Sequence, residues 1–191
     1  GVVFVVAAIA FKFGAVPFHM WVPDVYHGAP TAVTLFVSTA PKFAYFALFY
    51  RLLAQGLEGL SPTWTQIIAV IAVLSLFVGN VYAIAQTNLK RMLAYSSIAH
   101  TGYMLVGLAA YAAGQLSGLE GLLYYAAAYA FMNLGAFAVV ALVRNATGRE
   151  DLSAFRGLVR RSPVLAVTMT VFLLSLLGLV LNGIVTLARR R

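Results

Sequence analysis

The sequence predicts an all-α, polytopic membrane protein built as a bundle of about six transmembrane helices. Of its 191 residues, 62% are hydrophobic and only 9% are charged, whereas an ordinary soluble domain carries about 25% charged residues. Several apolar runs reach the roughly 20 residues that a helix needs to cross a bilayer. The runs are continuous rather than alternating, which argues against membrane-spanning strands.

We expect one transmembrane domain over residues 1–191, with six spans joined by polar links. A first span at about 2–18 precedes a turn with three prolines, at positions 17, 23 and 30. The second span, 31–54, contains Pro41, and four more follow at about 64–85, 92–112, 119–143 and 163–187. Because the chain starts at Gly1 inside a short apolar run, we expect a segment of a larger protein rather than a signal peptide.

The charge distribution indicates topology rather than nucleic-acid binding. The net charge is +8, but most basic residues lie in links or at the C-terminus, as the positive-inside rule describes. The side reached after the first, third and fifth spans holds seven basic residues, against Arg51 and the three terminal arginines on the other side. We therefore predict that the loop 144–162 is cytoplasmic. The seven are Lys90, Arg91, Arg144, Arg149, Arg156, Arg160 and Arg161.

Several kinds of chemistry are absent from the sequence. There is no cysteine, which excludes thiol catalysis, disulfides and cysteine-ligated iron–sulfur clusters. The three histidines have no ligand-like spacing, and no phosphate-binding loop or nucleophile elbow occurs. The sequence thus predicts no catalytic residue, no metal site and no cofactor-binding site in this chain.

Two lysines lie inside predicted spans, where an ammonium costs about 3 kcal/mol or more. If the cytoplasmic edge lies at Phe18 and Thr31, Lys12 is ~9 Å deep and Lys42 ~17 Å deep. Lys42 directly follows Pro41, which removes a backbone donor and frees a carbonyl. Burial disfavours the charged form of lysine, so such a group can gain and lose a proton. For Lys12, the alternative is that its long stem lifts the ammonium to the interface.

A histidine and several hydroxyls accompany the lysines. His100 is predicted at ~12 Å depth and Asn133 at ~15 Å, and histidine titrates near physiological pH. Ser96, Ser97 and Thr101 flank His100 and can order water around it. A core histidine bonded to a hydroxyl is the alternative. We predict proton transfer through Lys12, Lys42 and His100, with Ser96, Ser97, Thr101 and Asn133 in support.

Three ordered blocks of the sequence resemble the antiporter-like membrane subunits of respiratory complex I. The similarity is greatest to the subunit N branch of bacterial NADH–quinone oxidoreductase, called subunit 2 in mitochondria and chloroplasts. The second block runs over residues 87–100 and the third over residues 150–158. The first comprises Pro17-Phe18-His19, Trp21, Pro23-Asp24-Val25-Tyr26 and Gly28-Ala29-Pro30-Thr31.

The resemblance implies part of an antiporter-like inverted-repeat fold and a proton-translocating subunit in a bacterial inner membrane. Lys12, Lys42 and His100 match positions assigned to the family's proton route. The implied partners are other membrane-arm subunits and the lipid bilayer, with no nucleic acid. NADH, FMN, iron–sulfur clusters and quinone would belong to other subunits, so redox catalysis would not occur in this chain.

The resemblance has two departures that keep alternatives open. The family's first repeat, with its glutamate, is absent from this sequence. The family's outlet lysine and its preceding prolines are also missing from the stretch after Ser175. The alternatives are a subunit that exchanges a cation for protons and a truncated structural remnant that conducts nothing. The carboxylates Glu58 and Glu120 lie at span edges, which disfavours a sodium site.

Overall fold

The computed structural model describes the backbone of residues 1–188 and the side chains of residues 1–177. Helices make up the described chain, which contains an isolated bridge between Asn88 and Asp151 but no extended strand. The predicted all-α bundle is therefore confirmed. In order, the elements are α1 (Val2–Phe13), α2 (Trp21–Gly28), α3 (Thr31–Val37), α4 (Ala40–Phe49), the π-helix η1 (Tyr50–Gln55), the 3₁₀ helix η2 (Glu58–Leu60), α5 (Ser61–Ile84), α6 (Leu89–Ala112), α7 (Ser117–Thr147), the 3₁₀ helix η3 (Leu152–Phe155), α8 (Leu158–Arg161) and α9 (Pro163–Ala188).

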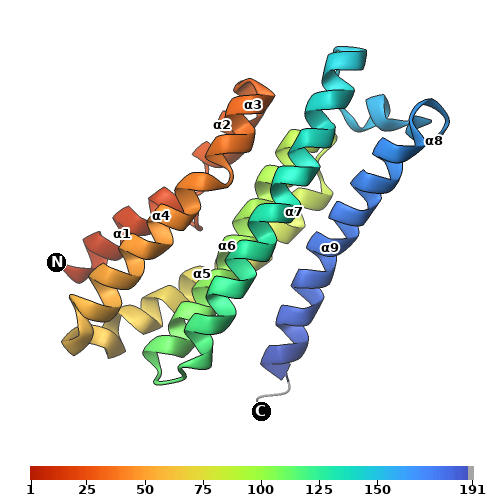
Figure 1. Ribbon diagram of the computed structural model, residues 1–191. Helices are drawn as coiled ribbons and strands as arrows, with labels where there is room; N and C mark the ends of the chain where they lie inside the picture. The colour runs from red at the N-terminus through yellow and green to blue at the C-terminus, as the bar shows by residue number, and fades with distance from the viewer. Residues whose placement is uncertain (189–191) are drawn as a thin grey trace.

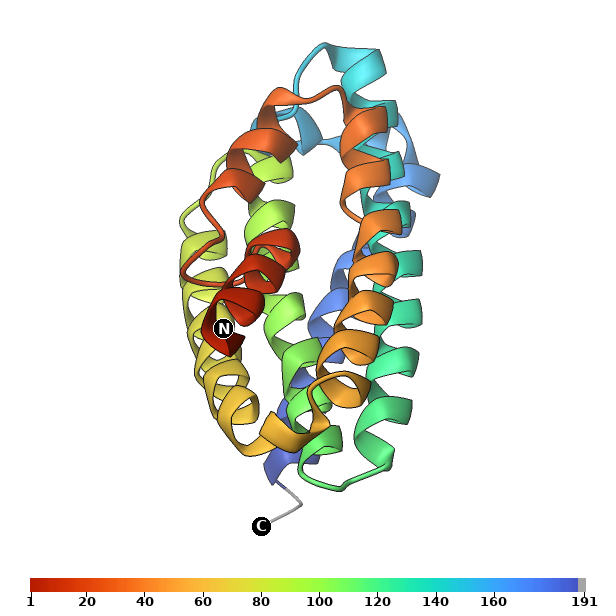
Figure 2. The same ribbon diagram turned by 90° about the vertical axis from the view of Figure 1, so that its left-hand side faces the viewer.

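The first predicted span is a broken helix, and the predicted proline-rich turn contains a second helix. Helix α1 ends at Phe13 because Gly14 adopts a left-handed conformation and its N–H bonds back to Ala10 and Phe11. Helix α2 then begins at Trp21 and tolerates Pro23 because proline needs no N–H partner in a first turn. Figure 2 shows α2 nearer than α1 to the end at which α3 begins.

The second predicted span is also interrupted, close to Pro41. Helix α3 stops at Val37, and α4 restarts at Ala40 with Pro41 in its first turn. Between them, the hydroxyls of Ser38 and Thr39 both donate to the carbonyl of Leu35, at 3.0 and 3.1 Å. These side chains satisfy a carbonyl that a continuous helix would have paired with backbone.

Helix α6 is the centre of the bundle, packed against α5 on one side and α7 on the other, with α9 beyond α7 (Figure 1). Among the described residues, three helical segments are long and apolar enough to cross a membrane by length and composition: Thr31–Gln55, Glu58–Ile84 and Ser117–Thr147. Helix α6 is more polar than these because its neighbours cover it. Its buried side chains include Lys90, Ser97, His100 and Thr101.

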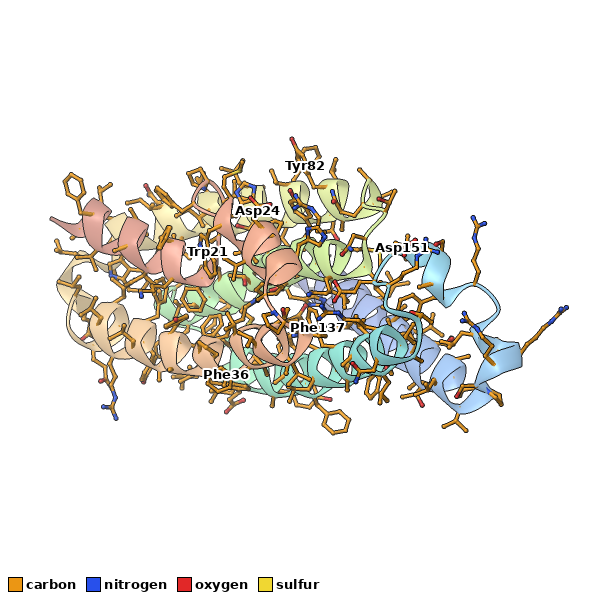
Figure 3. The ribbon with its side chains drawn as sticks, turned by 90° about the horizontal axis from the view of Figure 1, so that it is seen from above. Trp21, Asp24, Phe36, Tyr82, Phe137 and Asp151 are labelled. Carbon is orange, nitrogen blue, oxygen red and sulfur yellow. The ribbon has the colours of Figure 1, made fainter. Side chains whose placement is uncertain are left out.

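The outer faces of the bundle are apolar, as a membrane protein requires. Phe77 and Phe131 are mostly exposed on α5 and α7, whereas Phe137 is fully buried. Figure 3 shows Tyr82 and Phe36, both exposed, on opposite outer sides of the bundle with Phe137 between them.

Three connections meet at one end of the bundle. The backbone N–H of Leu89 donates to Glu150, that of Leu152 donates to Thr87, and the Lys90 ammonium donates to Ala29. The seven basic residues expected on one side therefore lie on segments of this end, which stays the predicted cytoplasmic side. The expected loop 144–162 is partly helical here, since α7 continues to Thr147 and α8 follows Gly157. The three terminal arginines lie outside the described residues.

Close approach of α5 and α6 depends on Gly79, and this gives a test of the packing. A methyl group at Gly79 would lie 2.6 Å from the backbone nitrogen of Ala99, whereas one at Gly121 on α7 would meet nothing within 4 Å. We expect Gly79→Ala to destabilise the subunit by about 1–3 kcal/mol through overpacking. The matched control Gly121→Ala should be neutral or stabilising, since alanine favours a helix by about 1 kcal/mol. The aggregation temperature of the solubilised subunit measures both; equal effects would contradict the packing.

Candidate functional site

The interruption between α3 and α4 places Lys42 inside the bundle. Lys42 lies in the first turn of α4, and only 7% of it is exposed. Its ammonium donates to the Ser97 hydroxyl at 2.6 Å, the Ser97 carbonyl at 3.1 Å and the Thr101 hydroxyl at 3.1 Å. These three acceptors match the three donors of an ammonium. All three are neutral, so hydrogen bonds hold the group without an opposite charge.

Aromatic rings from α7 complete the surroundings of this ammonium. The Lys42 nitrogen lies 5.0 Å from the centre of the Tyr129 ring, within the range of a cation–π interaction. The Tyr129 ring also packs against the ring of His100, with 4.9 Å between the ring centres. His100 is 1% exposed, and its Nδ1 lies 2.8 Å from the Tyr125 hydroxyl. We call Lys42, Ser97, Thr101, His100, Tyr125 and Tyr129 the lysine–histidine cluster.

The four polar residues predicted to support Lys42 differ in whether they contact it. Ser97 and Thr101 contact Lys42 directly. Asn133 donates to the Ser38 hydroxyl at 2.9 Å and so braces the helix interruption rather than the ammonium. Ser96 is half-buried and makes none of the cluster's hydrogen bonds among the described residues.

Lys12 is not part of the lysine–histidine cluster. It is exposed on α1, and its ammonium lies 5.9 Å from the centre of the Tyr45 ring. Tyr45 stands one turn after Lys42 on α4, so Lys12 contacts the helix that carries Lys42 without contacting Lys42 itself. Among the described residues, no hydrogen bond or ion pair joins Lys12 to Lys42 or to His100.

Sequence reasoning missed Tyr125 and Tyr129. They precede Asn133 on α7 at intervals of four residues, which places all three on one helix face. This four-residue spacing was the feature of the sequence from which the two tyrosines could have been assigned to the same interior face as Asn133. An aromatic stripe at this spacing is also what an ordinary helix core contains, and only the facing Lys42 distinguishes the two.

A second polar cluster ties the helix ends together. Glu150 accepts from Lys90 at 3.2 Å, from Arg144 at 3.0 Å and from the Thr31 hydroxyl at 3.1 Å. Lys90 is 1% exposed, so it is a buried structural residue as well as a topology signal. Asp24 pairs with Arg91 at 2.7 Å while remaining 74% exposed. Within residues 1–177, no group of three or more His, Cys, Asp and Glu side chains could hold a metal ion.

Comparison with known proteins identifies the family. The sequence model described as "NADH:quinone oxidoreductase/Mrp antiporter, TM" matches residues 1–183. The chain belongs to this family. Within it, NADH-quinone oxidoreductase subunit N of Thiobacillus denitrificans is 52% identical over 180 residues, which are 94% of this chain and 37% of that protein. The corresponding protein of Coxiella burnetii is 51% identical over 179 residues, covering 93% and 36%.

Solved structures of family members and related complexes share the fold. A chain of respiratory complex I from Thermus thermophilus, with bound aureothin, matches with a TM-score of 0.72 and 40% identity, covering 89% of this chain and 36% of that one. A chain of an archaeal membrane-bound sulfane sulfur reductase matches at a TM-score of 0.80 and 22% identity, covering 95% and 38%. The second likeness is one of fold alone. This chain spans a little over a third of the length of these relatives.

We call Glu150, Lys90, Arg144 and Thr31 the Glu150 cluster. We expect its ion pairs to contribute more to stability than the exposed pair of Asp24 and Arg91. Glu150→Gln should destabilise the subunit by about 3 kcal/mol, because it leaves the buried Lys90 charge uncompensated. Asp24→Asn, which breaks the exposed pair with Arg91, should cost only about 0–1 kcal/mol. Thermal aggregation of the solubilised subunit compares the two variants. An equal effect of both substitutions would contradict a structural role for the Glu150 cluster.

Proposed function

We propose that this chain is part of a proton-translocating membrane subunit of NADH–quinone oxidoreductase, with Lys42 as its central proton-exchanging group. The observation that carries the proposal is a buried ammonium whose acceptors among residues 1–177 are all neutral. Loss of its proton leaves a neutral amine among hydroxyls that can then donate to it, so neither state leaves a bare charge on a partner. A buried ion pair would instead favour the charged state throughout a cycle.

The proposed subunit moves protons and takes no part in electron transfer. NADH, FMN, iron–sulfur clusters and quinone would belong to other subunits, and their redox reactions would change the charge near Lys42 from a distance. The partners would be other membrane-arm subunits in a bacterial inner membrane. Family membership and about 50% identity to proteins named NADH-quinone oxidoreductase subunit N support this assignment.

His100 and Lys12 are proposed as further proton-transfer residues with separate positions. His100 lies inside the lysine–histidine cluster and can receive a proton originating at Lys42. Lys12 lies outside the cluster, exposed on α1 beside Tyr45 of α4, and would exchange protons with groups outside the cluster. Ser97 and Thr101 would set the position of the Lys42 nitrogen, and Asn133 would hold the helix interruption.

Cation–proton exchange is a second candidate because the family also contains Mrp antiporter subunits. A sodium ion prefers oxygen ligands that include carboxylates. None of the ion pairs or hydrogen bonds found in residues 1–177 brings an acidic side chain to Lys42, and Glu58 and Glu120 are exposed. The geometry therefore favours proton transfer alone.

Lys42→Arg tests the proposal directly. Arginine keeps the positive charge but does not deprotonate in proteins, so NADH-driven proton uptake by inverted membrane vesicles should fall by about 10²-fold, the scale of a lost proton-transfer group. Arg51→Lys, at an exposed position of η1, is the control and should pump normally. Assembly is measured for each variant by native electrophoresis. Normal pumping by an assembled Lys42→Arg complex would refute the proposal and favour a non-conducting structural role.

A further inference from the structure

A cavity of about 240 Å³ opens at the end of the bundle that lies away from the predicted cytoplasmic side. Its lining residues come from η1, η2, the start of α5, the end of α6 and the link from α6 to α7. Figures 1 and 2 both show these segments together at the end opposite to α8. Because α5 begins at Ser61 and α6 ends at Ala112, the cavity lies near the depth at which membrane helices leave the hydrocarbon region.

A carboxylate, a phenol and a hydroxyl line this cavity. They belong to Glu58, Tyr111 and Ser61. Glu58 is exposed and makes no ion pair among residues 1–177. The ring of Tyr111 packs against that of Tyr50, with 5.5 Å between the ring centres, and the two hydroxyls lie 3.3 Å apart. The cavity therefore combines an unpaired negative charge with an aromatic ring that a neighbouring tyrosine holds in place.

This lining suits an ammonium better than an anion or a metal ion. None of the described residues that line the cavity is a lysine or an arginine, so an anion would meet only the charge of Glu58. A metal ion needs several oxygen ligands, and the described chain has no group of three or more His, Cys, Asp and Glu side chains that could hold one. An ammonium pairs with a single carboxylate, donates to a hydroxyl and is attracted to the face of a tyrosine ring.

Apolar and aromatic residues at the cavity indicate that the ammonium belongs to a lipid. Leu116 lines the cavity and is 76% exposed, and Leu60, the residue before Ser61, is 46% exposed. Trp64 also lines the cavity, and its indole N–H donates to the Leu57 carbonyl. Tryptophan and tyrosine are enriched at the headgroup level of membranes. A phospholipid can cover exposed leucines with its glycerol and acyl carbons, which is favourable, whereas a small amine cannot.

We propose that this cavity binds the ammonium headgroup of a zwitterionic phospholipid in the leaflet opposite to the predicted cytoplasmic side. The ammonium pairs with Glu58 and lies against the Tyr111 ring, and the acyl chains extend over Leu116. A primary ammonium can also donate to the Ser61 hydroxyl, whereas a quaternary one has no N–H. Phosphatidylethanolamine should therefore bind more tightly than phosphatidylcholine, and both more tightly than the anionic phosphatidylglycerol. The site includes neither Lys42 nor His100, so the inference goes beyond proton transfer and does not depend on it.

The experiment is photo-crosslinking of lipids to the complete subunit within the assembled oxidoreductase, reconstituted in vesicles. Each lipid carries its photoreactive group on the acyl chain, and mass spectrometry locates the labelled peptides. Phosphatidylethanolamine should label residues 54–64 and 111–116 more than the other two lipids do. Glu58→Gln should reduce this labelling about tenfold, the effect of losing one charge-assisted hydrogen bond. The matched control is Glu120→Gln, which changes an exposed carboxylate of α7 outside the cavity lining and should label like the native complex.

Each other outcome overturns the proposal. Equal labelling by phosphatidylethanolamine and phosphatidylglycerol would mean that Glu58 selects no ammonium. Absence of labelling in the native complex would mean that protein covers the cavity. Competition by free ethanolamine at the same concentration as the lipid would assign the site to small amines.

A second variant covers the case in which Glu58→Gln changes the local structure. Ala112→Leu keeps the carboxylate and places a larger side chain into the cavity that Ala112 lines. Labelling by phosphatidylethanolamine should then fall although the charge is unchanged. Undiminished labelling in Ala112→Leu would overturn the cavity as the binding site. Lipid labelling rather than proton uptake is the readout, so either result leaves the proposed function to its own test.

Discussion

Burial of the Lys42 ammonium on neutral acceptors is the constraint on which the rest of the site depends. A charge in a bilayer interior is costly, and the protein offsets part of that cost with three hydrogen bonds and the face of Tyr129. Because no carboxylate fixes the charge in the described cluster, gain and loss of a proton change the interactions of one group rather than break an ion pair. Burial of the ammonium thus costs free energy, while its neutral acceptors suit the proposed proton exchange.

The helix interruptions make this arrangement possible. A continuous helix across Ser38 and Thr39 would satisfy its own carbonyls, and Pro41 prevents that. The hydroxyls of Ser38 and Thr39 donate to the carbonyl of Leu35, and Asn133 from α7 donates to the Ser38 hydroxyl. At the start of α3, Thr31 donates to Glu150, which also pairs with Lys90 and Arg144, and Lys90 donates to the carbonyl of Ala29. Side-chain contacts therefore fix the position of α3 at its first residue and, through Ser38 and Asn133, just after its last.

The sequence was sufficient to predict the helical membrane bundle, because long apolar runs have few alternatives in a bilayer. It also predicted that Lys42, His100, Ser97 and Thr101 belong to an interior polar site. It could not predict that residues 21–28 form a helix, since Pro23 reads equally as a turn residue until its place in a first helical turn is known. Nor could it separate Lys12 from Lys42 or select Tyr129 from ten tyrosines, because both depend on which helix faces meet.

The central claim is that Lys42 changes its protonation state during turnover. Infrared difference spectroscopy of the assembled complex, with lysine side chains labelled by nitrogen-15, measures this directly. We predict an isotope-sensitive ammonium band that changes when NADH is added and disappears from the difference spectrum in Lys42→Gln. A lysine difference band that persists unchanged in Lys42→Gln, or no such band in the native complex, would contradict the account.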